Sequence, residues 1–363
     1  MIVVTAEKLS PIQEILELAK WAPSGDNTQP WRFSVISERR ADIHGFDTRD
    51  HCAYDLGGRA SHMALGALLE NVILAAGRFG QRVVWQHRPD SPDHAPILEL
   101  TFTPDETVRE DPLVDAIRLR AVNRRPYRNC PLPLPAQARL EEVVQDLGYR
   151  VRWYPTLSAR WEMVRLTSLA GKLRLSIPET YPVHRDIIEW GVRFSEDRVP
   201  DQAIGLDPLT LRLTRWIMQR WERVRFFNTY LAGTLIPRLE LDIVPGLACS
   251  AHFVLIAEDG SSTLVNDLMA GRALQRFWLQ ATTLGLQLQP EMTPLIFYRY
   301  GVSGVRLSQA PGAQTLVDRI TRKFVQIVGE DAGHAVFMGR IGYADPVSAR
   351  SIRLPWSRLQ MKA

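Results

Sequence analysis

Two long apolar segments of the chain resemble each other, and this repeat constrains the fold more than any other feature. The segments MALGALLENVILAAGRFG (63–80) and LMAGRALQRFWLQATTLG (268–285) align with Gly66 and Gly80 opposite Gly271 and Gly285. Both are apolar almost all round, which is typical of helices buried in the centre of a molecule. The repeat therefore predicts two similar halves that each contribute one central helix.

A second repeat precedes each of these segments. PIQEILELAK (11–20) and PAQARLEEVV (135–144) share Pro, Gln, Leu and Glu at the same offsets, and proline is common at the first position of a helix. Strand-like runs follow or surround the apolar segments: WRFSVI, RVVWQ and ILELTF in the first half, RVRWY, HFVLIA and VFMGRIGY in the second. We expect an α+β fold of two similar halves, 1–112 and 113–363, joined near the charged, proline-containing stretch 103–112.

The second half also contains an insertion at about 185–245 that reads as additional helices. Its stretch LRLTRWIMQRWERVRFF alternates aromatic side chains with arginines. Three interpretations stay open: a helical excursion packed on the body, a lid over a pocket, or a helix that meets a membrane surface or a partner.

Composition excludes several classes of protein. With 363 residues, of which 45% are hydrophobic and 23% charged, the chain is long enough for two cores and is neither disordered nor fibrous. The net charge of +4 is spread along the chain, so we expect no nucleic-acid partner. The apolar run at 63–76 is interrupted by Glu70 and Asn71 and is short for a bilayer, and MIVVTAEKLS at the N-terminus does not read as a secretion signal. We therefore expect no membrane span.

Cysteine and histidine usage gives no sign of a metal site. Cys52, Cys130 and Cys249 are widely separated, so they predict neither a disulfide framework nor a zinc site. We therefore expect a protein of the reducing cytoplasm that binds no metal.

Two polar motifs occur once each, in opposite halves. The first is the opening loop, PSGDNTQPW (23–31), which follows the first helix, and the second is RLRAVNRRPYRNCPLP, which begins at Arg118. The glycine-rich fingerprint of a dinucleotide-binding Rossmann domain does not occur.

These motifs resemble the nitroreductase superfamily of flavin enzymes. APSGDNTQPWRF looks like its N-terminal signature, and RAVNRRPY resembles its phosphate-binding arginine motif in the form seen in the tandem, Acg-like branch. FMGRIGYADP and ARSIRLPWSRL, near the C-terminus, are similar to its closing strand and the arginine segment that follows. The resemblance implies a nitroreductase-like fold in which the two halves form a fused pseudo-dimer. One complete FMN site would remain, with the loop from one half and the arginine motif from the other.

The resemblance places the flavin phosphate beside Arg120, Asn123 and Arg125, with Arg350 and Arg353 as candidates to complete the cage. Guanidinium groups suit this role because they donate two parallel hydrogen bonds to a phosphate. The family usually has serine where Asn123 stands. Without the resemblance, ordinary solvated arginines would be the better interpretation.

The opening loop suits the ring end of the cofactor. An amide such as Asn27 or Gln29 can match the alternating donor and acceptors of the flavin pyrimidine edge. Pro23 ends the helix and Gly25 permits close approach of the backbone, while Ser24 belongs to the same loop. Simple turns and caps are the alternative explanation, particularly for Ser24 and Asp26.

A third contact region is predicted after the second apolar segment. By resemblance, Gln289, Pro290 and Glu291 in LGLQLQPEMTP would lie near flavin N5 and O4. A plain helix-to-strand connection is the alternative for each of these residues.

The resemblance implies an FMN-dependent oxidoreductase that transfers hydride from NAD(P)H to a small electron-poor acceptor such as a nitro compound or a quinone. No catalytic acid or base is expected, because solvent can protonate the product. Two alternatives stay open: a flavin-binding or sequestering protein without turnover, and a flavin module of a biosynthetic modification pathway. Pairing of the fused unit into a homodimer also stays open.

Overall fold

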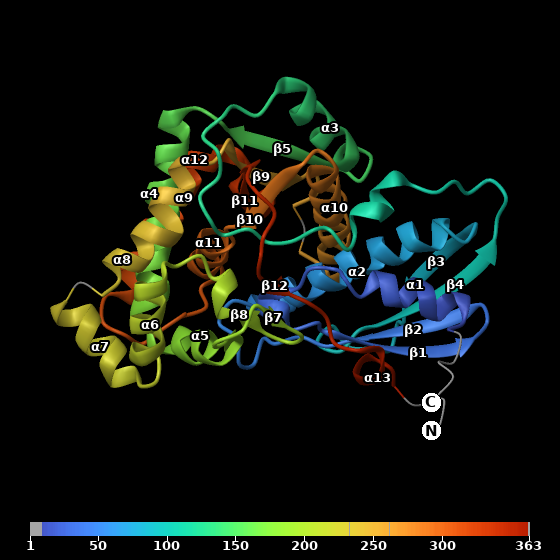
Figure 1. The fold of residues 1–363 in the computed structure, drawn as a ribbon, viewed down its shortest axis with the longest axis horizontal. Helices are drawn as coiled ribbons and strands as arrows, with labels where there is room; N and C mark the ends of the chain where they lie inside the picture. Colours follow the sequence, from blue (N-terminus) through green and yellow to red (C-terminus); the bar gives the residue numbers. More distant parts are fainter. Residues whose placement is uncertain (1–8, 232, 261, 362–363) are drawn as a thin grey trace.

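The chain folds into two α+β halves built around a pair of central helices (Figure 1). The computed structural model describes residues 9–231, 233–260 and 262–361. The expectation about a secretion signal concerns residues 1–8, which lie outside the described residues. The first half consists of α1 (Pro11–Ala19), β1 (Trp31–Ser37), β2 (Arg40–Gly45), α2 (Arg59–Gly77), β3 (Gln81–His87) and β4 (Ile97–Pro104).

The second half repeats this order of elements. It consists of α3 (Leu134–Gln145), β5 (Tyr149–Tyr154), β9 (Ala251–Ala257), α10 (Leu264–Thr283), β10 (Leu286–Pro290) and β11 (Ala335–Tyr343). The first sheet has the order β1-β2-β4-β3 and the second β5-β9-β11-β10, and all neighbours in both are antiparallel. The predicted α+β fold of two similar halves is confirmed, while the boundary between residues 112 and 113 stays a prediction.

All six predicted strand runs form strands, but β2 and β10 were not predicted. β2 reads RADIHG, and its polar residues Asp42 and His44 interrupt the apolar pattern that identifies a strand. α1 begins where the proline predicted, because Ser10 caps it. The Ser10 hydroxyl accepts from the Gln13 N–H, and the Gln13 side chain accepts from the Ser10 N–H.

The central helices α2 and α10 touch at the glycines that the repeat aligned. A Cβ atom on Gly66 would lie 1.9 Å from the carbonyl oxygen of Leu268, and one on Gly271 would lie 2.0 Å from that of Met63. Only glycine permits the two helices to approach this closely. The contact is reciprocal, because the glycine of each helix lies against the backbone of the other. The stretch Leu56–Gly77 has the length and composition of a membrane span, but 83% of its apolar window is buried inside the protein, as in a core helix.

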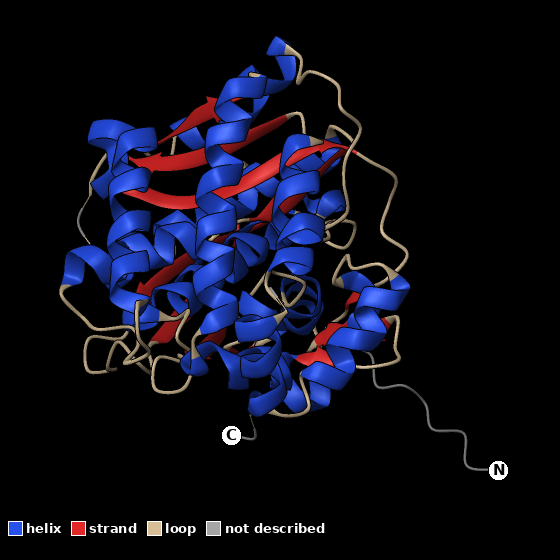
Figure 2. Ribbon diagram, turned by 90° about the vertical axis from the view of Figure 1, so that its left-hand side faces the viewer, coloured by secondary structure: helices blue, strands red, loops and turns tan. Residues whose placement is uncertain are grey.

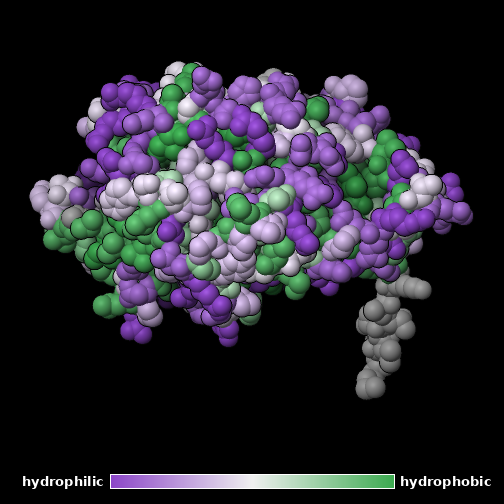
Figure 3. Space-filling view, turned by 90° about the horizontal axis from the view of Figure 1, so that it is seen from above, coloured by the Kyte–Doolittle hydropathy of each residue, from purple (hydrophilic) through white to green (hydrophobic). Residues whose placement is uncertain are grey.

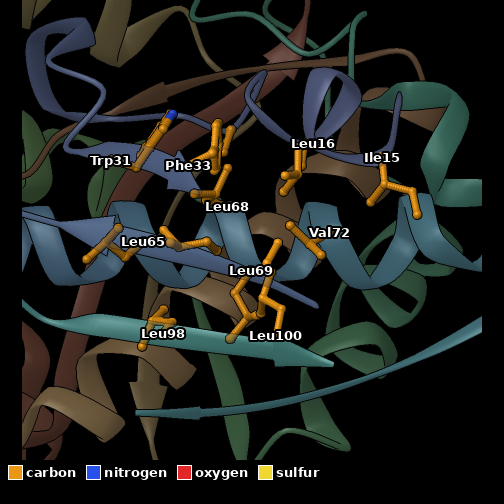
Figure 4. Close-up of a cluster of buried hydrophobic side chains, with 14 of the residues drawn as sticks. Ile15, Leu16, Trp31, Phe33, Leu65, Leu68, Leu69, Val72, Leu98 and Leu100 are labelled. Atoms are coloured by element: carbon orange, nitrogen blue, oxygen red, sulfur yellow. The ribbon is translucent and has the colours of Figure 1, made fainter. Parts of the chain in front are cut away.

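The first sheet is covered by helices on one face only. α1 and α2 pack on this face around a core that includes Leu16, Phe33, Leu68 and Leu100 (Figure 4). On the opposite face Val84 is 59% exposed, and burial alternates along β3 as expected for a sheet with one solvated face.

The second sheet is covered on both faces. α3 and α10 pack on one face, while three further helices pack on the other: α4 (Leu157–Ser176), α11 (Thr293–Ser303) and α12 (Ala313–Val328). Figure 2 shows the strands crossing behind long helices. All seven residues of β9 are buried, as expected for a strand enclosed between two layers.

The extra helices come from two long connections in the second half. Residues 155–250 join β5 to β9, whereas only residues 38–39 separate β1 from β2; α11 and α12 lie between β10 and β11. The predicted insertion at 185–245 thus falls within a longer one. Besides α4, it contains α5 (Tyr181–Ile187), β6 (Ile188–Glu189), β7 (Phe194–Ser195), β8 (Val199–Pro200), α6 (Pro208–Ile217), α7 (Trp221–Tyr230), α8 (Leu235–Arg238), a π-helical turn (Leu239–Ile243) and α9 (Val244–Leu247).

The outer face of the insertion is unusually apolar. Hydrophobic side chains gather at this end of the molecule (left in Figure 3), and α6 has no buried residue. The exposed large apolar residues of this face are Leu209, Leu213, Trp216, Phe226, Tyr230, Leu231, Leu235, Ile236, Leu239 and Val244. A gathering of exposed apolar side chains of this kind is typical of an interaction site.

The C-terminal arm ties the two halves together. β12 (Arg350–Ser351) pairs with β7 of the insertion, and α13 (Trp356–Leu359) then packs on the first half. The Trp356 ring stacks on Phe33 with their centroids 5.6 Å apart. The arm therefore brings Arg350 and Arg353 to the junction of the halves and the insertion.

Candidate functional site

A cavity of about 490 Å³ lies where the two halves and the insertion meet. This size is within the range of sites that hold small molecules and cofactors. Four irregular segments form part of its wall: the opening loop (23–27), the arginine loop (120–124), the segment after β10 (291–294) and the C-terminal arm (350–353). The facing sides of α2 and α10 also line it. The two motifs that occur once in the sequence thus meet at one cavity.

Ten of the thirteen residues predicted for the site lie on this wall. They are Pro23, Ser24, Gly25, Asn27, Arg120, Gln289, Pro290, Glu291, Arg350 and Arg353. The structure places the other three, Gln29, Asn123 and Arg125, off the wall.

The opening loop has an uncommon backbone. Asp26, Asn27 and Gln29 have φ angles of 52°, 62° and 49°, the only positive values at non-glycine positions among the described residues. Such conformations cost energy and persist where surrounding contacts hold them. The Ser24 hydroxyl supplies one such contact by accepting from the Gln29 N–H at 3.0 Å.

The amides of Asn27 and Gln29 are both hydrogen-bonded to protein groups. Asn27 Nδ2 donates to the Glu196 carbonyl at 3.0 Å, and its Oδ1 accepts from Arg353 at 2.9 Å. Gln29 Nε2 donates to the same Glu196 carbonyl at 2.8 Å, and its Oε1 accepts from the Leu354 N–H at 2.9 Å. These bonds fasten the loop to the insertion and the arm, which corrects the expectation that either amide is free for a flavin edge.

Three arginines form a buried cationic cluster at one end of the cavity. Arg120 and Arg353 are buried and Arg350 is half-buried, and none of them pairs with a carboxylate among the described residues. Burial, together with the charges of Arg353 and Arg350, lowers the pKa of Arg120 well below its usual value. Burial and Arg350 lower the pKa of Arg353 to about 9. Like charges held together without a counter-ion favour binding of an anion.

Aromatic rings and carbonyl groups position this cluster. The Arg120 guanidinium lies 4.6 Å from the ring centroid of Trp278, and Arg350 and Arg353 lie over Trp21. Arg120 donates to the Trp21 carbonyl at 2.9 Å, but its Nε is buried without any partner. An unpartnered buried donor within a cationic cluster is what a missing anionic ligand would satisfy.

The arginine motif presents a different residue from the one predicted. Arg125 is exposed and lies off the cavity wall, whereas its neighbour Arg124 lines the cavity. Asn123 is buried, where it donates to the Asp345 carbonyl at 3.2 Å and accepts from the Arg125 N–H at 3.1 Å. Asn123 therefore shapes the turn of the arginine loop. The sequence motif alone did not distinguish which of the adjacent residues Arg124 and Arg125 lines the cavity.

Glu291 lies on the cavity wall within a buried charge network. Its carboxylate accepts from His252 Nδ1 at 2.7 Å and from Arg340 Nη1 at 3.0 Å, while His252 Nε2 lies 3.0 Å from the Gly246 carbonyl. Burial opposes charge on His252, but Glu291 and Cys249 together outweigh it and raise the pKa of His252 to about 10. Burial likewise opposes charge on Glu291, yet His252 and Arg340 lower its pKa. Both partners are therefore ionised.

Sequence reasoning missed His252 and Arg340. Arg340 stands inside the quoted motif FMGRIGYADP, and a charged residue in an otherwise apolar strand was an available signal. His252 begins the run HFVLIA and had no signal of its own, because its partner lies 39 residues further along the chain.

The insertion closes the far side of the cavity. α4 contributes Arg174 and the π-helical turn contributes Asp242, while Met218, which follows the last residue of α6, also lies on the wall. His184 of α5 binds the Tyr54 hydroxyl at 2.8 Å, and burial together with Arg174 lowers its pKa to about 3, so the ring is neutral. Of the three interpretations of the insertion, this placement favours a cover over a pocket.

Comparison with known proteins agrees with the motifs. Residues 4–54, which include the opening loop, match the profile of the nitroreductase family. This segment of the chain is similar to the nitroreductase family.

Two Mycobacterium tuberculosis proteins are similar to this chain. One, an uncharacterized protein, is 27% identical over 358 residues, and the alignment covers 94% of this chain and 47% of that protein. The other, named as a candidate NAD(P)H nitroreductase, Acg, is 31% identical over 198 residues, covering 53% of this chain and 58% of that protein. The chain thus spans about half the length of the curated relatives that it matches.

Two solved structures show a distant likeness. A nitroreductase-like family protein from Bacillus cereus is 12% identical with a TM-score of 0.33, covering 70% of this chain and 96% of that one. The FMN-dependent nitroreductase NfnB from Mycobacterium smegmatis, solved in complex with NADPH, is 14% identical with a TM-score of 0.35, covering 68% and 96%.

The cavity combines features that suit a phosphorylated flat cofactor. One end is cationic, and the facing sides of α2 and α10 supply Met63, Ala64, Ala67, Leu274 and Trp278.

Among the described residues, no group of three or more histidine, cysteine, aspartate or glutamate side chains is arranged to hold a metal ion.

Proposed function

We propose that the protein is an FMN-dependent oxidoreductase that passes hydride from NAD(P)H through the flavin to a small electron-poor acceptor. The observation that carries this proposal is the buried cluster of Arg120, Arg350 and Arg353, which has no carboxylate counter-ion among the described residues. A flavin phosphate carries nearly two negative charges and would supply that counter-ion. The match of residues 4–54 to the nitroreductase family supports the choice of FMN over other phosphorylated ligands.

The rest of the wall supports a flavin ring beyond the phosphate. Small and apolar residues of α2, such as Ala64 and Ala67, leave room for a flat ring, and the closing insertion limits access of water. When bound, the flavin itself supplies the redox chemistry by accepting and releasing hydride. The protein's part is to hold the phosphate, position the ring and exclude water. We assign no catalytic acid, since solvent can protonate the product.

A second candidate is a flavin-binding protein that does not turn over. The observation in its favour is the insertion, which reaches over the cavity with residues from α4 to the π-helical turn. A cover of this kind can retain a flavin and also keep an electron donor out. Rapid reduction by NADH or NADPH would count against this candidate. A role in a biosynthetic modification pathway has no feature of the described residues in its favour.

An anaerobic absorption experiment tests the proposal. We expect the purified protein to show flavin absorbance at about one FMN per chain, and to lose it when NADPH or NADH is added. Absorbance that persists with both donors would support the non-turning-over candidate. A colourless protein that takes up no added FMN would refute both, because the arginine cluster would then hold some other anion.

We also propose that the fused unit forms a homodimer in the cytoplasm. The exposed apolar face of the insertion supports pairing, because Trp216, Phe226 and Tyr230 lie there without cover from the described residues. Sedimentation velocity would test this, with Phe226→Glu expected to give monomers. If the wild-type protein is already a monomer, the homodimer is wrong.

A further inference from the structure

Arg174 projects into the cavity with its hydrogen-bonding capacity unused. It donates no hydrogen bond within the described residues, and its Nε is buried without a partner. Its nearest carboxylate oxygen, Asp242 Oδ1, is 3.9 Å from Nη2, which is beyond hydrogen-bond distance. By contrast, Arg238 donates to the carbonyl and hydroxyl of Ser168 at 2.7–3.1 Å. A guanidinium has five N–H donors, so Arg174 is available to a ligand.

Arg124 is a second cation on this part of the wall. It donates one hydrogen bond, to the Ala203 carbonyl at 3.1 Å, and forms no ion pair within hydrogen-bond distance among the described residues. Burial lowers the pKa of Arg124, and the positive charges of Arg340 and Arg174 lower it further, although Asp26 opposes them. Arg124 and Arg174 line the same cavity and carry like charges, so an anion bound between them would reduce their mutual repulsion.

Asp26 and Asp242 are the carboxylates whose charges act on these arginines. Burial raises the pKa of Asp26, although Arg124 and Arg174 oppose the change. Burial also raises the pKa of Asp242 to about 6, against the effect of Arg174. Both groups therefore hold protons more readily than ordinary aspartates, and Asp242 loses its negative charge as the pH falls below about 6.

We infer that Arg174 and Arg124 form a second anion subsite in the cavity, distinct from the cluster of Arg120, Arg350 and Arg353. The inference rests on the proposed function: the subsite takes a carboxylate or phosphate group of a molecule that exchanges electrons with the flavin. The cavity that Arg174 lines also has apolar wall residues from the insertion and its flanks, Leu175, Ile188, Met218 and Leu241, which suit the body of an aromatic or aliphatic acid. The anionic group could belong to the acceptor or to a phosphorylated nicotinamide donor, and these two sources can be distinguished.

Isothermal titration of the protein as purified, in the absence of an electron donor, tests the subsite. The acceptor arm compares 4-nitrobenzoate with its neutral counterpart 4-nitrobenzamide, and the donor arm compares adenosine 2′,5′-bisphosphate with 5′-AMP. Arg174→Gln should weaken binding of the more anionic compound of at least one pair by about 10-fold or more, since a hydrogen bond to a charged group contributes about 1.5–3 kcal/mol. The affinity for the less anionic compound of that pair should change by less than about twofold.

Two further variants make the result specific. Arg174→Lys keeps the charge and should retain most of the affinity, whereas Arg225→Gln removes an exposed arginine from α7, away from the cavity wall, and should have no effect. A loss of affinity for 4-nitrobenzoate alone would show that the anionic group belongs to the electron acceptor. A loss of affinity for the bisphosphate alone would show that it belongs to the nicotinamide donor. Equal loss for both members of each pair, or no loss in either arm, would overturn the inference. Flavin content, measured on the same samples, tests the proposed function separately because titration does not depend on flavin absorbance.

Discussion

The two halves share one sheet topology but differ in what surrounds the sheet. The first sheet has helices on one face and solvent on the other, whereas the second is enclosed between two helical layers. The difference arises in two connections, since residues 38–39 in the first half correspond to 155–250 in the second, and residues 88–96 correspond to 291–334. The duplicated framework thus tolerates large insertions where strands connect, because these connections lie on the surface.

This asymmetry shapes the cavity at the junction of the halves. The first half contributes the opening loop, and the second contributes the arginine loop, the segment after β10 and the covering insertion. A symmetric pair of halves would have offered two equivalent cavities. The elaboration of one half instead builds one cavity with walls of unequal chemistry, cationic at one end and partly apolar under the insertion.

The strongest test of the shared framework is the contact between the central helices. Gly66→Ala and Gly271→Ala should each lower the free energy of unfolding by about 3 kcal/mol or more, because the added methyl meets backbone atoms that cannot move aside locally. Urea unfolding measures the effect. Gly333→Ala, where a Cβ would meet nothing within 4 Å, is the matched control. If only one of the two central variants is destabilised, the contact is not equivalent in the two halves.

Enclosure of the second sheet makes its charge network sensitive to pH. The pKa of His252 is raised from 6.5 to about 10, despite burial, mainly by Glu291, so its contribution to stability is full below pH 6.5 and is lost as the pH rises toward 10. Glu291 has a lowered pKa, so its contribution is lost only in acid. His252→Gln should cost about 3 kcal/mol at pH 6, since it breaks a buried ion pair. The deficit relative to wild type, measured by urea unfolding, should shrink between pH 6.5 and 10; a constant deficit would show that His252 is neutral.

A comparison of two nearby arginines sharpens the account of the arginine loop. Arg120→Ala should weaken FMN binding by about 10-fold or more, because a buried charge-assisted contact to the phosphate is lost. Arg125→Ala should leave binding within about twofold, since Arg125 is exposed and off the cavity wall. Retained flavin absorbance after gel filtration measures both. Equal losses of FMN binding in the two variants would mean that a place on the cavity wall does not determine which arginines of the motif bind the phosphate.

The smallest expected effects concern the turn glycines at the ends of the central helices. Gly80 and Gly285 have φ angles of 60° and 72°, and a Cβ at either position would meet nothing within 4 Å. Gly80→Ala and Gly285→Ala should therefore each cost only about 1–2 kcal/mol, from the left-handed backbone conformation alone. Matching losses in thermal unfolding would confirm that these turns are equivalent, and a loss as large as that of Gly66→Ala would contradict it.

Much of the framework could be predicted from the sequence, because its signals are local. The apolar periodicity and the aligned glycines of 63–80 and 268–285 identify two buried helices, and alternating strand runs place the sheets beside them. The long second-half insertion was visible as residues with no counterpart in the first half. β2 was missed because Asp42 and His44 break its pattern, and α4 was not recognised as part of the insertion.

The candidate site was predictable only in outline. The sequence determined that a polar loop and an arginine motif each occur once, in opposite halves, and the structure brings both to one cavity. Which side chains face that cavity depended on tertiary structure, because adjacent residues such as Arg124 and Arg125 point in different directions along an irregular loop. The partners of Asn27 and Glu291 lie far away in the chain, at Glu196 and His252. Contacts of this kind are set by how the halves, the insertion and the C-terminal arm pack together, and local sequence patterns carry no record of that packing.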